Sequence, residues 1–219
     1  MKPKQNIAEY SPLEERINIV SHASGLLFSA VGVVFLVWKA VQHGTLVHTL
    51  SFAVFGLSLC LLYAASTAYH SATAPRRRLA LRVLDHASIY VLIAGTYTPF
   101  ALIVLDGAVG WSIFAAAWSM ALIGITLKLF FTGRFDHVST AMYVFMGWVI
   151  MFAIKPLVAN FSTEGLIWLV SGGIAYTVGA LFYSIRKMPF GHATFHVFVL
   201  LGSLCHFVCV YFYVLTPTA

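Results

Sequence analysis

Three histidines, a carboxylate and a serine gather near the predicted ends of three apolar segments. The stretch "GHATFHVFVL" places His192 and His196 one helical turn apart, on one face of a helix. "STAYH" ends a second apolar run with His70, and Ser66 lies one turn before it. Asp85 opens a third run, "LDHASIYVLIAGTYTPF". Ionisable groups in long apolar segments are costly unless they are paired or bind an ion, so these side chains are candidates for a functional site.

A metal ion would explain this set of side chains. Three neutral histidines with one open position form a common catalytic zinc site, in which zinc lowers the pKa of water to about 7 and polarises a carbonyl. Asp85 would then hold that water or act as a general base, and Ser66 would hydrogen-bond to the water or to a substrate oxygen. The alternative is that the histidines lie at a wet interface and only reach toward water. Spacing alone leaves both readings open.

The composition indicates the elements that must position these residues. The chain has 219 residues, of which 60% are hydrophobic and 9% charged, a balance typical of an integral membrane protein. Apolar stretches long enough to cross a bilayer as helices run over Ile17–Trp38, Leu46–Tyr69, His86–Leu105, Ala108–Leu127, Val138–Ile154, Leu166–Ile185 and His192–Leu215. None alternates like a strand of a membrane barrel. The sequence therefore predicts an all-α integral membrane protein with a bundle of seven transmembrane helices.

The connections between these stretches are short, as in "RKMPFG", so we expect one domain over residues 1–219. Residues 1–16 form a short polar N-terminal segment, followed by a full-length span rather than by the short apolar region and cleavage site of a removable signal peptide. All three cysteines fall inside predicted spans, which predicts packing rather than an exposed disulfide.

Basic residues are distributed unevenly between the two ends of the predicted helices. Of the 13 lysines and arginines, 11 fall at the end that carries the candidate site: Lys2, Lys4, Arg16, Arg76, Arg77, Arg78, Arg82, Lys128, Arg134, Arg186 and Lys187. Only Lys39 and Lys155 fall at the other end. Cytoplasmic loops carry such an excess, so we expect a cytoplasmic N-terminus and an outside C-terminus. The net charge of +6 fits contact with anionic inner-leaflet lipids. Nucleic acid is not an expected partner, because the basic residues only flank predicted membrane helices.

Other polar residues give weaker predictions near the same end. Glu15, Asn18 and His22 lie at i, i+3 and i+7, so they share a face at the start of the first span. They could contact the metal ligands on the side away from the ion, or they could simply form the polar cap of a membrane helix.

Three further histidines are not expected to bind the same ion. His86 follows Asp85 and points about 100° away on a helix, so we expect only Asp85 to face the site. His137 is expected in a loop. His206 lies 14 residues beyond His192, about 21 Å deeper, so it could line the same cavity without sharing the ion.

Several blocks carry a resemblance to a known family. "EERINIVSH", "STAYH", "LDHASIYVLIAGTYTPF" and "GHATFHVFVLLGSLCHF" resemble signature blocks of the bacterial hemolysin III family, within the progestin and adipoQ receptor group, over roughly Glu15 to Tyr213. The resemblance implies a zinc ion held by His70, His192 and His196. It also implies that Asp85 and Ser66 lie close to the ion. The large cytosolic N-terminal region of the adiponectin receptors is absent, which argues against hormone-receptor signalling.

Three functions of different classes follow as expectations. The first is zinc-dependent hydrolysis of an amide or ester of a membrane lipid, serving membrane-lipid homeostasis in the bacterial inner membrane. The second is a non-enzymatic sensor or regulator of lipid state. In this case zinc has only the structural role of holding helices together, and lipid is a ligand. The third is a pore-forming cytolysin, which the sequence disfavours because a seven-span protein without a removable signal stays in its own membrane.

Overall fold

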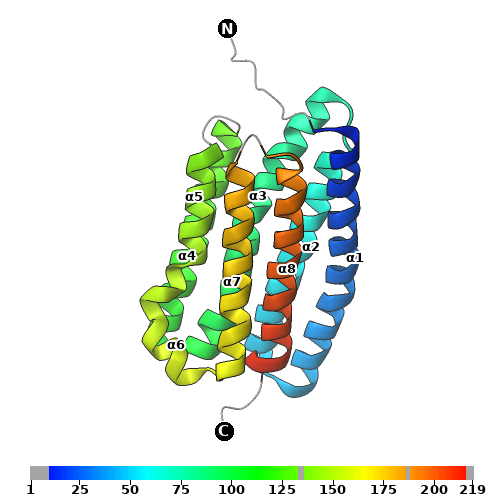
Figure 1. The fold of residues 1–219 in the computed structure, drawn as a ribbon. Helices are drawn as coiled ribbons and strands as arrows, with labels where there is room; N and C mark the ends of the chain where they lie inside the picture. Colours follow the sequence, from blue (N-terminus) through cyan, green and yellow to red (C-terminus); the bar gives the residue numbers. More distant parts are fainter. Residues whose placement is uncertain (1–9, 133–135, 186–187, 216–219) are drawn as a thin grey trace.

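The computed structural model describes residues 10–132, 136–185 and 188–215 of the protein. Within these residues every regular element is a helix. The elements are α1 (Pro12–His43), α2 (Leu46–Ser71), α3 (Pro75–Pro99), η1 (Phe100–Leu105), α4 (Gly107–Phe131), α5 (Asp136–Gly147), η2 (Val149–Ala153), α6 (Ile154–Asn160), α7 (Thr163–Ser184), α8 (Gly191–Cys209) and η3 (Val210–Val214). They form 7 segments long and apolar enough to cross a membrane, lying side by side in one bundle (Figure 1). The predicted all-α, seven-span architecture is confirmed.

Polar caps fix where three of the long helices begin. Ser11 accepts a hydrogen bond from the backbone N–H of Glu14, and Pro12 occupies the first position of α1, where its missing N–H costs nothing. Ser162 caps α7 in the same way by accepting from the N–H of Gly165, whereas Asp106 caps α4 by accepting from the N–H of the next residue, Gly107. Because α1 begins at Pro12, the predicted polar segment 1–16 already contains the first turn of this helix.

The surface of the bundle is apolar where a soluble protein would be polar. Large side chains such as Phe28, Phe130 and Phe152 point outward, the last with 82% of its surface exposed. In a bilayer these side chains contact lipid, which needs no polar covering. The most enclosed span is the one formed by α3 and η1, which the other helices surround. Residues on several faces of α3 therefore point into the protein.

Three spans depart from regular α geometry, the last of them at its end, where α8 continues as the π-helical η3. Pro99 ends α3, and the chain continues as the π-helical η1 because a proline removes a backbone donor and crowds the preceding turn. The predicted continuous span Val138–Ile154 is broken, since α5 ends at Gly147 and the 3-10 segment η2 precedes α6. Pro156, in the first turn of α6, cannot continue the helix that precedes it. Tyr97 satisfies the freed backbone: its hydroxyl donates to the carbonyls of Met146 and Gly147, each at 2.9 Å.

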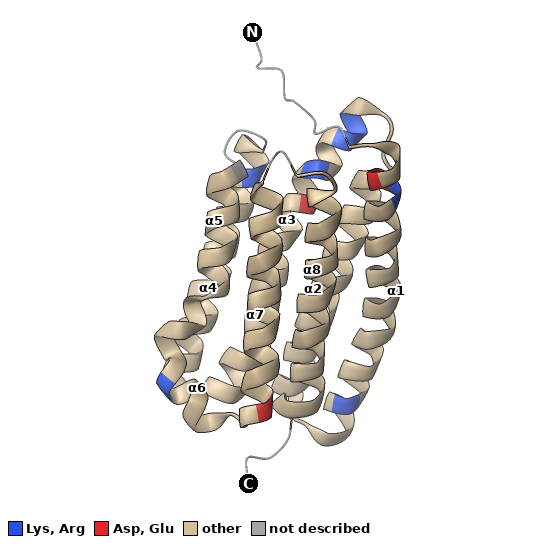
Figure 2. Cartoon of the chain, in the orientation of Figure 1, with Lys and Arg blue, Asp and Glu red and all other residues tan. Residues whose placement is uncertain are grey.

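Charged residues collect at the two ends of the bundle, and Lys and Arg are concentrated at the end where α1 begins (Figure 2). Lys39, in the last turns of α1, and Lys155, in the first turn of α6, lie away from that end, as the sequence predicts. Five of the basic residues in that prediction, Lys2, Lys4, Arg134, Arg186 and Lys187, lie outside the described residues. The orientation of the bundle and the assignment of residues 1–219 to one domain stay predictions.

Candidate metal centre

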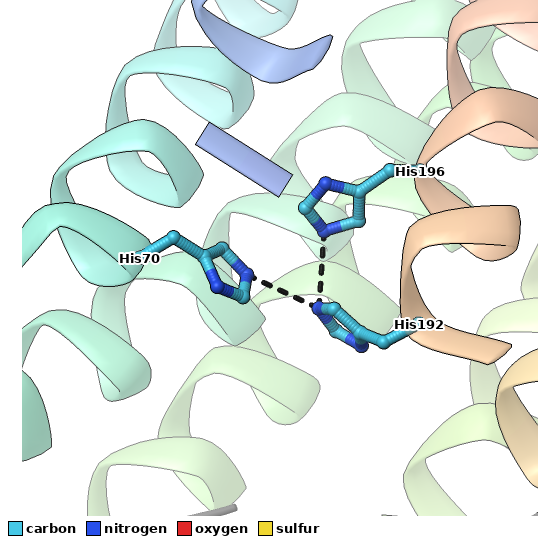
Figure 3. Close-up of side chains that lie close together, drawn as sticks. All are labelled: His70, His192 and His196. Atoms are coloured by element: carbon cyan, nitrogen blue, oxygen red, sulfur yellow. Dashed lines mark hydrogen bonds between the residues drawn. The ribbon is translucent and has the colours of Figure 1, made fainter. Parts of the chain in front are cut away.

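The structure brings His70, His192 and His196 together at one point between α2 and α8 (Figure 3). His70 lies in the last turn of α2, and the other two lie in the first turns of α8. The Nε2 atom of His192 is 3.1 Å from that of His70 and 3.0 Å from that of His196. One ligand nitrogen of each residue lies within 4.8 Å of the other two.

The partners of the other ring nitrogens indicate that lone pairs face this point. His70 Nδ1 lies 2.6 Å from Glu15 Oε2, and because a carboxylate only accepts, Nδ1 carries the hydrogen. Ser21 donates its own hydroxyl hydrogen to the carbonyl of Asn18, so at 3.4 Å its oxygen accepts from His196 Nδ1. In the neutral rings, Nε2 of His70 and Nε2 of His196 are then both unprotonated. A single N–H on His192 Nε2 could satisfy only one of them, whereas a cation would satisfy all three nitrogens.

The spacing also fits a metal ion. Zinc–nitrogen bonds of 2.0–2.1 Å in a tetrahedron place ligand nitrogens about 3.3 Å apart, a few tenths of an ångström more than the two short separations here. His70 and His196 are buried, at 3% and 1% exposure, so their lone pairs are cut off from bulk water. The three histidines could therefore hold a metal ion with small rotations of their side chains.

Asp85 and Ser66 lie beside this cluster, in the same cavity as His192 and His196. Ser66 Oγ is buried and makes no hydrogen bond of ordinary geometry among the described residues, while the Asp85 carboxylate lies close enough to interact with it. A buried hydroxyl without a protein partner is costly, so it marks a place where water or a polar group of a ligand belongs.

The cavity continues from the cluster into the middle of the bundle. Its walls are largely apolar, with Leu62, Ile89, Ile93 and Val199 among its lining residues, and it reaches His206 in the opposite half. Such a shape suits an apolar chain with one polar end.

Three further histidines can be compared with the sequence prediction. His86 lines the same cavity as Asp85, although we expected only Asp85 of these two neighbours to face the site. The reason is the central position of α3, which has protein on both sides. His137 lies in the first turn of α5 rather than in a loop, with its side chain exposed. His206 lines the cavity far from the histidine cluster, where its Nε2 lies 3.1 Å from the carbonyl oxygen of Leu169.

Glu15 links the cluster to a residue that sequence reasoning missed. One carboxylate oxygen accepts from His70, and the other accepts from Arg78 of α3. Arg78 also donates to the carbonyl of Ala72 at 3.2 Å and lies over the Tyr69 ring. In the sequence Arg78 is one of three consecutive arginines, and nothing there distinguishes it from its neighbours.

Asn18 and His22 pack against the ligands from the same face of α1. Asn18 is fully buried, with its Nδ2 atom 3.5 Å from His70 Nδ1. The ring of His22 is stacked on that of His196, with centroids 3.6 Å apart and planes 7° from parallel. Both residues thus contact ligand rings, and their supporting role stays a prediction.

Tyr10 covers the cluster from the end of the bundle and was not singled out by the sequence. Its ring stacks on His192 at a centroid distance of 4.7 Å and lies 5.7 Å from the His70 ring. Burial raises the pKa of its phenol, so the hydroxyl stays protonated and can donate a hydrogen bond.

Glu15→Gln is expected to weaken zinc binding about 10- to 100-fold, because the amide cannot match the carboxylate in orienting His70 and raising its basicity. Zinc affinity would be measured by competition with a chromogenic chelator. Glu14→Gln is the matched control, since the neighbouring position points about 100° away. Unchanged affinity in Glu15→Gln would show that the carboxylate does not support the ligand.

Comparison with known proteins identifies the family to which the chain is similar. A family model described as "Haemolysin-III related" matches residues 10–207. Hemolysin-3 of Bacillus cereus is 47% identical over 206 residues, which cover 94% of each chain. The Hemolysin-3 homolog of Bacillus subtilis (strain 168) is 46% identical over 200 residues, 91% of this chain and 94% of the relative.

A more distant similarity reaches animal proteins. The monocyte to macrophage differentiation factor of Homo sapiens is 27% identical over 194 residues, covering 82% of this chain and 80% of that protein. The family match spans the seven apolar segments up to α8 and includes all three clustered histidines. The chain is therefore a multi-pass membrane protein and belongs to the haemolysin-III related family.

Proposed function

We propose that the protein is a zinc-dependent hydrolase that cleaves an amide or ester of a membrane lipid, and that it serves lipid homeostasis in the bacterial inner membrane. The observation that supports this most is the convergence of three imidazole nitrogens at one end of a largely apolar cavity that also contains Asp85 and Ser66. A lipid could place its polar linkage at the cluster and its hydrocarbon chain along the apolar walls.

His70, His192 and His196 would hold the ion, leaving a fourth position open. When bound, zinc supplies Lewis acidity and lowers the pKa of water to about 7, which makes hydrolysis feasible near neutral pH. Glu15 keeps His70 in the tautomer that presents Nε2, and Ser21 does the same for His196. These contacts preorganise the ligands before substrate arrives.

Asp85 and Ser66 would carry the proton transfers and substrate alignment. Asp85 accepts a proton from the attacking water as its oxygen adds to the carbonyl carbon. It then returns this proton to the leaving nitrogen or oxygen as the carbon–nitrogen or carbon–oxygen bond breaks. The Ser66 hydroxyl, which makes no hydrogen bond of ordinary geometry in the described chain, can donate to the carbonyl oxygen of the substrate. The apolar walls limit the access of bulk water.

A non-enzymatic sensor of lipid state is the second candidate. Its support is that the histidines come from two helices only, α2 and α8, so a metal ion would fasten these two helices together. The cavity would then bind lipid without cleaving it. A cytolytic role, suggested by the name of the Bacillus relatives, has less support, because seven apolar spans keep this chain in its own membrane.

Metal analysis and lipid-product analysis of the same purified preparation test the proposal. We expect about one zinc per chain and release of a fatty acid from lipids that contain an amide or ester. A chelator should abolish the release, and added zinc should restore it. A zinc-loaded protein that cleaves none of these lipids would favour the sensor, and a protein without zinc would reject both functions.

A further inference from the structure

A second hollow lies at the opposite end of the bundle, far from the histidine cluster. It has a volume of about 390 Å³ and lies between α2 and α4, with the end of α3 and η1 as its floor. The residues that matter most among its lining are Ser51, Thr98, Asp106, Trp111 and Trp118. This end of the bundle also carries α6 (Figure 1). We refer to this hollow as the α2–α4 groove.

Ser51 is the first unusual feature of the α2–α4 groove. In membrane helices a serine hydroxyl usually donates to a carbonyl of its own helix, as Ser29 does to Gly25 and Ser58 does to Phe55, each at 2.7 Å. Ser51 is 1% exposed, yet its Oγ has no partner among the described residues. Among the described residues, only one other buried hydroxyl lacks a hydrogen bond of ordinary geometry, that of Ser66 beside the histidine cluster. A buried donor of this kind calls for an acceptor from outside the chain.

Asp106 is the second unusual feature. Its backbone has a φ of 47°, a conformation uncommon for a residue with a side chain. Its Oδ1 accepts from the N–H of Gly107 at 2.7 Å, which fixes the carboxylate at the rim of the groove. Among the described residues that line the groove none is basic, so this carboxylate is its one formal charge. The charge of the groove therefore complements a cation.

Aromatic rings form the α4 wall of the groove. Trp111, Phe114 and Trp118 follow one another at helical spacing, and Trp118 is fixed by its Nε1–H, which donates to Thr98 Oγ1 at 3.2 Å. Tryptophan is typical of the headgroup level of a bilayer and can also bind a cation on its face. Ser51 lies five residues into α2 and Trp111 five residues past Asp106, so both lie about 7.5 Å below the helix ends. With the helix ends at the headgroup level of a bilayer, this depth is that of the lipid ester groups.

We propose that the α2–α4 groove binds one phospholipid with a primary ammonium headgroup, phosphatidylethanolamine. The ammonium contacts the Asp106 carboxylate, and an ester carbonyl accepts a hydrogen bond from Ser51. One acyl chain lies along Trp118. This site requires neither a metal ion nor hydrolysis, so it stands independently of the proposed function.

Native mass spectrometry of the delipidated full-length protein in detergent tests the site, with dioleoyl phosphatidylethanolamine and dioleoyl phosphatidylglycerol titrated separately. We expect one tight binding event, about three- to tenfold tighter for phosphatidylethanolamine. Asp106→Asn should remove this preference. Asparagine caps a helix and tolerates a positive φ, so the fold should survive. Ser51→Ala should weaken both lipids equally, because both have ester carbonyls.

Matched controls separate the site from general effects on lipid binding. Glu164→Gln removes an acidic residue at the start of α7, and Ser29→Ala removes a buried serine that already has a partner. Neither should change the preference. Phosphatidylethanolamine with an acetylated amine should bind the unmodified protein like phosphatidylglycerol, a measurement that needs no variant. Equal binding of all these lipids, unaffected by Asp106→Asn, would show that the protein binds only nonspecific annular lipid. This result would overturn the proposal.

Discussion

Replacing His192 or His196 with alanine is expected to remove most of the zinc from the purified protein. Zinc binding by small protein sites has a free energy of about 10 kcal/mol or more, so each of three ligands contributes roughly 3 kcal/mol. Losing one ligand should weaken binding more than about a hundredfold. Zinc per chain would be measured by elemental analysis after gel filtration through buffer with a weak chelator.

His206→Ala is the matched control for this experiment. His206 is also a buried histidine of α8, but it lies in the other half of the bundle, next to the carbonyl of Leu169. Its removal should leave the zinc content nearly unchanged, even if it lowers the melting temperature. Equal zinc content in all three variants would reject the ligand assignment. Zinc loss in the His206 variant alone would place the ion in the distal half of the cavity.

Asp85→Asn is expected to retain zinc and fold while losing hydrolytic activity. The amide has the shape of the carboxylate but cannot accept a proton, and a positioned general base typically contributes about 10²- to 10⁴-fold in rate. Zinc content and thermal stability should stay close to those of the unmodified protein, because Asp85 is close to the ligands without being one of them. Fatty acid release and complementation of any membrane phenotype would be measured on the same variant.

Asp106→Asn makes the same chemical change at the other end of the bundle and should leave hydrolysis unaffected. This comparison separates the loss of a base from the loss of any buried or capping carboxylate. Full complementation by zinc-loaded Asp85→Asn would defeat the general-base hypothesis and favour the sensor. Zinc loss in Asp85→Asn would instead make Asp85 a ligand.

Much of the fold could be predicted from the sequence, because the bilayer leaves few choices. A run of about 20 apolar residues must satisfy its backbone hydrogen bonds internally, so its composition already implies a helix. The seven spans follow from this rule. It does not determine irregularities within a span, and the break between α5 and α6 depends on Pro156 and on the Tyr97 hydroxyl that stabilises the freed backbone.

The candidate site was predictable where its residues share a helix or a depth. His192 and His196 lie one turn apart, and His70 ends a helix at the same level, so periodicity alone brings them near one another. Long side chains that cross between helices escape this reasoning. Arg78 reaches Glu15 from α3, and Tyr10 folds back over His192 from before α1.

The sequence by itself determined which segments can span a membrane and how far along its helix each residue lies, because hydropathy and helical rise depend only on the order of residues. The tertiary structure decided which faces point inward. Asp85 and His86 both line the cavity because α3 is enclosed on several sides, a property of its neighbours and not of its own pattern. Likewise, Ser51 and Ser66 are ordinary serines in the sequence. Only packing shows that their hydroxyls lack partners in the described chain, since a contact depends on how helices distant in sequence meet.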